Sequence, residues 1–194
     1  MAYDLNSASE QRTGDLIPDG TIVNVHMTVR PGNSGEGGWL KRSKAGDSQA
    51  LDCEFTVLDG AYAKRKFWSL MTMEGTTEGH AKAAEISAAR LRAILESVNG
   101  IRPDDESPNA AVKRRVNSLG EFDGVRFVAK VGIEKGKDGY KDKNSLAAVI
   151  TPDRKDWSKV EQIAKQGNFQ QVGTVAAGVV ANAAAAAGKP SWAS

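Results

Sequence analysis

The sequence is poor in cysteine, histidine and aromatic residues, and these shortages exclude several kinds of protein. The single cysteine, Cys53, permits neither an internal disulfide nor a cysteine-based metal cluster. His26 and His80 lie far apart in the chain, without the short spacing of a metal-binding pair. No nucleophile and base can be proposed by motif. We therefore expect a non-enzymatic protein without metal or other cofactor.

Long apolar runs and targeting signals are also missing. No apolar stretch reaches the ~18 residues of a membrane span, and the first residues lack the order of a secretory signal. The glycines of 32–38 are not followed by the Lys-Ser/Thr pair of a phosphate-binding loop. These absences predict a cytoplasmic protein. The net charge of +2 is too small to identify a nucleic-acid partner.

Alternation of apolar and polar residues is what the sequence does contain. Every second residue from 51 to 57 is apolar, a period typical of a strand with one buried face. The Asp59-Gly60 pair that follows is a strong hairpin signal. In the next run, 65–73, apolar residues occupy both faces, which is typical of a strand covered on both sides. This hairpin is the centre of the predicted fold.

The same criteria predict the other elements. We expect strands at 21–29, 49–58, 65–73, 124–133 and 146–150, a main helix at 80–98, and shorter helices at 109–119 and 154–165. One helix between the third and fourth of five strands is the order of an OB-fold, a Greek-key barrel. We therefore predict a mainly β protein of the α+β class with a five-stranded OB-fold barrel. Its parts would be a flexible segment 1–17, a domain 18–166 and a disordered, Ala/Gly-rich tail 167–194.

Two loops of this barrel are candidate binding elements. OB-folds bind ligands on the face of strands two and three and in the loops joining strands 1–2 and 4–5. Those loops are 30–48 and 134–145, and each combines basic residues with an aromatic residue. Single-stranded nucleic acid needs both, because phosphates attract cations and unpaired bases stack on rings. The candidate nucleic-acid-binding residues are Trp39, Lys41, Arg42, Lys44, Arg65, Lys66, Trp68, Lys130, Lys135, Lys137, Tyr140, Lys141 and Lys143.

Other roles are open for several of these residues. Trp39 and Tyr140 either stack on bases or close the ends of the barrel. For Trp68, core packing is the favoured alternative to a place on the binding face. The alternation places Asp52 and Glu54 on the outer face, where carboxylates would repel phosphate. We therefore expect that part of the face not to contact DNA.

A resemblance adds to this interpretation. Residues 16–157 resemble small phage and prophage proteins that are similar to OB-fold single-stranded-DNA-binding proteins of replication and recombination cassettes. The most diagnostic stretch is the hairpin, with Val57, Leu58, Asp59, Gly60, Tyr62, Arg65, Phe67 and Trp68. The resemblance implies non-catalytic, largely sequence-independent binding of single-stranded DNA during phage DNA replication or recombination in the cytoplasm of the bacterial host.

The alternative hypothesis is an OB-fold protein-interaction module that assists a phage nuclease, recombinase or polymerase. Many bacterial single-stranded-DNA-binding proteins recruit partners through an acidic tail that ends near an aromatic residue. Here no acidic residue follows Glu161, but Trp192 is a candidate partner-docking residue near the end of the sequence. A homo-oligomer remains an open alternative.

Overall fold

The computed structural model describes residues 15–136 and 139–162. The predictions made for 1–14, for Lys137 and for the tail with Trp192 lie outside the described residues. Within those residues, no helix has the length and apolar character needed to span a membrane.

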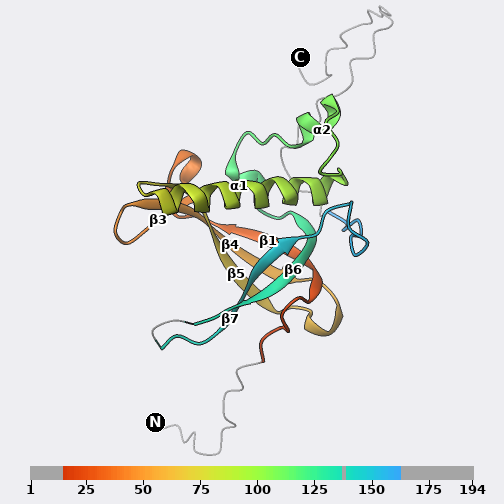
Figure 1. Cartoon of the computed structure of the whole chain (residues 1–194), viewed down its shortest axis with the longest axis horizontal. Coiled ribbons are helices and arrows are strands. Elements are labelled where there is room, and N and C mark those ends of the chain that lie inside the picture. Colours follow the sequence, from red (N-terminus) through yellow and green to blue (C-terminus); the bar gives the residue numbers. More distant parts are fainter. Residues whose placement is uncertain (1–14, 137–138, 163–194) are drawn as a thin grey trace, which may run out of the picture. The chain divides into compact units, whose positions relative to one another are not determined.

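Seven strands form one antiparallel sheet in the described part of the chain (Figure 1). The five long strands are β1 (Ile22–Arg30), β4 (Ser48–Val57), β5 (Lys66–Gly75), β6 (Arg126–Glu134) and β7 (Lys143–Val149). They confirm the five predicted strands to within a few residues. Two short strands, β2 (Asn33–Ser34) and β3 (Leu40–Arg42), lie in the segment predicted as a loop.

Strand β4 is central to the sheet. Its first residues pair with β3, its later residues pair with β1 along the same edge, and β5 pairs along the other edge. The sheet continues from β1 to β6 and from β6 to β7, so the strands predicted at 21–29 and 124–133 pair with each other.

Strands β5 and β7 face each other across an open seam. No backbone ladder joins them in the described residues, but the hydroxyl of Ser69 accepts a hydrogen bond from the backbone N–H of Leu146, at 3.0 Å. The α+β class is therefore confirmed, whereas closure of the sheet into the predicted barrel is not.

Helix α1 (Glu78–Asn99) is the main helix and packs against β5, β6 and β7. Its first turn is capped by the hydroxyl of Thr77, which accepts from the N–H of His80 at 3.1 Å. It ends at Gly100, which has the positive φ of 67° that glycine adopts without strain. Both ends confirm the sequence prediction, and Figure 1 shows α1 lying across one end of the curved sheet.

The two other predicted helices differ from expectation. The helix predicted at 109–119 is a shorter α2 (Pro108–Lys113), because Ser118 caps a separate 3-10 turn, η3 (Leu119–Phe122). The helix predicted at 154–165 is absent over 154–162. In that segment, the indole N–H of Trp157 donates to Ser97 on α1. The side chain of Gln162 accepts from the backbone N–H of Arg126 and donates to its carbonyl.

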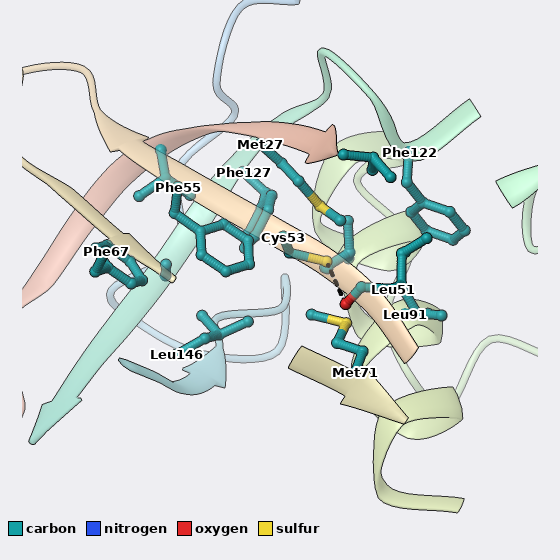
Figure 2. Close-up of a cluster of buried hydrophobic side chains, with 14 of the residues drawn as sticks. Met27, Leu51, Cys53, Phe55, Phe67, Met71, Leu91, Phe122, Phe127 and Leu146 are labelled. Carbon is teal, nitrogen blue, oxygen red and sulfur yellow. Dashed lines mark hydrogen bonds between the residues drawn. The ribbon is translucent and has the colours of Figure 1, made fainter. Parts of the chain in front are cut away.

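The core lies between the inner face of the sheet and α1 (Figure 2). The ring of Phe55 stacks on Phe67 at 5.1 Å between centroids and meets Phe127 edge-on at 6.0 Å. Cys53 is buried among these side chains, as predicted. Burial raises the pKa of its thiol to about 12, so the thiol stays protonated at neutral pH.

Candidate functional site

The outer face of β5 carries two large apolar side chains in contact with solvent. Phe67 and Met71 point into the core, while Trp68 and Leu70 on the opposite face are 44% and 61% exposed. The interpretation of β5 as covered on both faces is therefore wrong, and so is core packing of Trp68. Within 15–136 and 139–162 no layer covers the apolar residues of the second face, because α1 lies at the end of the sheet rather than over this face.

A groove of about 720 Å³ runs along the seam between β5 and β7. Residues from Arg65 to Leu70 line one side, and residues from Asp142 to Leu146 line the other. Leu16 and Arg90 also border it. Sequence analysis placed residues 1–17 in a flexible segment, yet Ile17 is buried and exchanges two hydrogen bonds of 2.8 Å with the side chain of Asn144 on β7.

Glu54 on β4 is the buried acidic residue of this face. It is only 6% exposed, although it lies on the predicted polar face of the strand. Three groups donate to its carboxylate: Lys66 at 2.5 Å, the indole N–H of Trp68 at 3.1 Å, and the guanidinium of Arg30. Chiefly through Lys66, these donors outweigh burial and lower the pKa of Glu54 from 4.5 to about 2.

Arg30 contacts Trp68 as well as Glu54. Its guanidinium lies over the indole ring, 5.7 Å from the ring centroid, which is a cation–π geometry. The ring is thus held at its N–H edge by a carboxylate and on one face by a cation. The expectation that Glu54 repels phosphate did not include these partners. Two cations of neighbouring strands balance the charge of Glu54.

Trp39 does not line this groove. Its ring packs against the core and lies on Gly120 of η3, where a Cβ atom would come within 2.4 Å of the indole. Of the two alternatives left open for Trp39, packing at one end of the sheet is the one that its position supports.

The remaining basic candidates near β3 to β6 are scattered. Lys41 pairs with Asp52 at 3.2 Å, and Arg42 and Lys44 are exposed nearby. Arg65 lines the groove and donates to the backbone carbonyl of Asp15. Lys130 is exposed on β6, which β4 and β1 separate from β5 in the ladder.

The β6–β7 hairpin presents Tyr140, which is 81% exposed. Its lysines are partly neutralised: Lys135 pairs with Asp142 at 2.7 Å, and Lys143 pairs with Glu134 at 3.3 Å. The first pair raises the pKa of Lys135 and lowers that of Asp142 through their hydrogen bond. Lys141 is exposed. Of the hairpin candidates that the structure describes, Lys143 is the one that reaches the groove.

Sequence reasoning did not select several residues of this site, among them Arg30, Leu70, Arg90 and Leu16. Arg30 is the last residue of β1. A single basic residue at the end of a strand is no signal of a binding site. Leu70 was predicted only as an apolar residue of a strand. Arg90 lies on α1, and the alternation of apolar and polar residues does not predict how that helix is oriented relative to the sheet. No local signal indicated that Leu16 borders the groove.

Searches for a metal site and for relatives give no assignment. Among residues 15–136 and 139–162, no three His, Cys, Asp or Glu side chains gather closely enough to hold a metal ion. No protein-family model matches the sequence, and neither does any curated protein.

Proposed function

We propose that this protein is a non-catalytic, largely sequence-independent single-stranded-DNA-binding protein of the OB-fold type, acting in phage DNA replication or recombination. The observation that carries the proposal is Trp68, an exposed ring on the outer face of β5 with Arg30 and Lys66 beside it and a groove along its strand. Stacking on such a ring tolerates any base, because every base has a π-face.

The topology supports the OB-fold part of the proposal. The long strands are ordered β5-β4-β1-β6-β7, with α1 between the third and fourth of them in sequence. The antiparallel pairings make β5 and β7 parallel, and these strands touch along the seam. This order and direction of strands support a Greek-key barrel in which β5 and β7 would meet at the seam. In that fold the ligand face belongs to strands two and three, here β4 and β5.

Charge in the groove is mixed, which predicts how binding depends on salt. Arg65, Lys66, Arg90 and Lys143 line the groove together with Asp52, Glu134 and Asp142. The three carboxylates are each paired with a lysine. Of the cations that line the groove, Lys66 and Lys143 are themselves paired with Glu54 and Glu134. Few cations are therefore available to phosphates, and stacking carries a large share of the affinity. We expect the binding constant to fall by about 0.7 log units per log unit of salt for each phosphate contact.

Titration of a fluorescently labelled oligo-dT, followed by anisotropy, tests the proposal. At about 50 mM and about 200 mM salt, the oligonucleotide should bind in both cases and more weakly in the second. A duplex of the same length is the control and should bind less tightly, because its paired bases cannot stack on Trp68. Absence of salt-sensitive binding to oligo-dT would rule the proposal out.

The second candidate function is a protein-interaction module for a phage nuclease, recombinase or polymerase. The observation that favours it is the seam, since β5 and β7 each pair with a single strand in the described residues and border the groove. An extended peptide can add to such a strand edge through its backbone. This candidate replaces the first if oligo-dT does not bind.

A further inference from the structure

Glu54 occupies a position where a carboxylate would be expected to oppose nucleic-acid binding. It lies next to Trp68 across the β4–β5 pair, in register with it, and next to Thr28 on β1. A buried negative charge on a surface that contacts phosphates lowers affinity unless it performs another task. Its hydrogen bonds indicate what that task is.

The carboxylate divides its two oxygens between different partners. Oε2 accepts from the indole N–H of Trp68 and from Arg30, while Oε1 accepts from Lys66. The N–H edge of the indole is therefore fixed toward β4. Arg30 is fixed as well, and its guanidinium covers one face of the ring. A free tryptophan on an open strand face would sample several rotamers, and binding would have to restrict them.

We propose that Glu54 is a positioning residue that sets the Trp68 ring for base stacking, so that this carboxylate promotes single-stranded-DNA binding in spite of its charge. The inference rests on the proposed function and adds a determinant to it. It assigns the base to the ring face that Arg30 does not cover. Loss of Glu54 frees both the indole edge and the two cations. The ring is then no longer pre-organised for stacking.

Asp52 provides a matched control on the same strand and the same face. It is two residues away, its side chain is 16% exposed against 8% for Glu54, and it pairs with Lys41. The hydrogen bonds of Trp68 do not include it. Removing either carboxylate makes the face more positive by one charge, and only removal of Glu54 releases the ring.

The experiment compares Glu54→Met with Asp52→Asn in oligo-dT titrations, after circular dichroism shows that both are folded. Methionine keeps the length of the side chain and removes its acceptors. We expect Glu54→Met to bind at least about five-fold more weakly than the parent. Asp52→Asn removes a negative charge from the groove and should bind more tightly than the parent. Binding of Glu54→Met equal to or tighter than that of the parent would overturn the inference and leave the proposed function intact.

A second measurement separates positioning from general destabilisation of the face. In a Trp68→Ala background, Glu54→Met should cause no further loss of affinity, because the ring that Glu54 positions is gone. An equal loss in both backgrounds would overturn the positioning role. If Glu54→Met does not fold, Glu54→Asp replaces it: the charge stays, the shorter side chain withdraws from the indole, and weaker binding is again expected. If the parent itself does not bind oligo-dT, the proposed function and the inference fail together.

Discussion

Two buried glutamates of this molecule are each bound by two cations, but these cations differ in their other contacts. Glu96 on α1 is 3% exposed and accepts from Arg92 and Arg114, both at 2.8 Å. Glu54 is almost as buried, at 6%, and accepts from Arg30 and Lys66. The two clusters have the same charges and similar contacts, so the carboxylates alone do not distinguish them.

The two clusters differ in the exposure and in the other hydrogen bonds of their cations. The side chain of Arg114 is 15% exposed, and its other N–H groups donate to the backbone carbonyls of Asp105 and Arg102. At Glu54, the side chains of Arg30 and Lys66 are each 49% exposed. At Glu96, Arg92 is 55% exposed, but like Arg114 it also donates to the connector between α1 and α2, at the carbonyl of Pro103. Donors directed at the protein's own backbone hold this connector in place, whereas half-exposed donors directed at a side chain remain accessible to a ligand. The comparison predicts that the Glu96 cluster contributes to stability and the Glu54 cluster to binding.

The largest expected effect is on stability at the Glu96 cluster. Arg114→Met should lower the free energy of unfolding by about 3 kcal/mol, because it leaves a buried carboxylate with one partner fewer and frees the carbonyls of the connector. The melting temperature should fall by roughly 6–12 °C in a thermal unfolding experiment. Affinity for oligo-dT, measured below the transition, should stay that of the parent. A loss of affinity without a loss of stability would reverse the assignment of the two clusters.

The next effect concerns Trp68, which we compare with Trp39. Trp68→Ala should weaken oligo-dT binding roughly ten- to hundred-fold, the usual cost of removing a stacking ring, with little change in melting temperature. Trp39→Ala should do the opposite, because that ring packs against the core and on Gly120. The pair of variants is measured by anisotropy titration and by thermal unfolding. Equal effects of both variants on binding would contradict the location of the site on β5.

A smaller effect is expected at the hairpin. Tyr140 is highly exposed but does not line the groove, so Tyr140→Ala should weaken binding several-fold, at the lower end of the range for a stacking ring. Tyr140→Phe is the control and should bind like the parent, because it keeps the ring. If Tyr140→Ala also binds like the parent, the DNA path is confined to the sheet face.

The last prediction concerns the pH dependence of stability rather than binding. The pKa of Glu54 in the folded protein is about 2, below the ordinary 4.5, so the unfolded state binds more protons in acid. The stability that Glu54 contributes is therefore complete above pH 4.5 and is lost as the pH falls toward about 2. Urea unfolding across this interval should show a steeper loss for the parent than for Glu54→Gln. Parallel pH profiles would mean that the carboxylate is not held as described.

The strands were predictable because their buried residues alternate, and β1 shows why. Its apolar side chains at Val23, Val25, Met27 and Val29 are all buried, as a period of two requires. The ends of α1 were predictable because Thr77 and Gly100 act locally, through hydrogen bonds within one turn. Such signals depend on neighbours in sequence, so no knowledge of the tertiary fold was needed.

The site was less predictable because it depends on contacts between strands. Trp68 has the same apolar character whether a layer covers it or not, and the sequence does not show that α1 packs at the end of the sheet rather than over this face. Burial of Glu54 requires donors from β1 and β5, whose register the sequence does not reveal. The groove arises along a seam where β5 and β7 meet without a ladder. The predicted loops therefore supplied Tyr140 and several lysines, but the sheet face supplies the centre of the site.

The reactivity of the single thiol, that of Cys53, can report how often the folded protein opens. Cys53 is fully buried, its S–H donates to the carbonyl of Leu51 at 3.6 Å, and its raised pKa keeps thiolate negligible at neutral pH. A thiol reagent can therefore react only in molecules whose core has opened. The labelling rate then gives the population of opened chains without an introduced probe. Comparing that rate with and without oligo-dT would show how far a ligand on the outer face of β4 and β5 restrains the inner face.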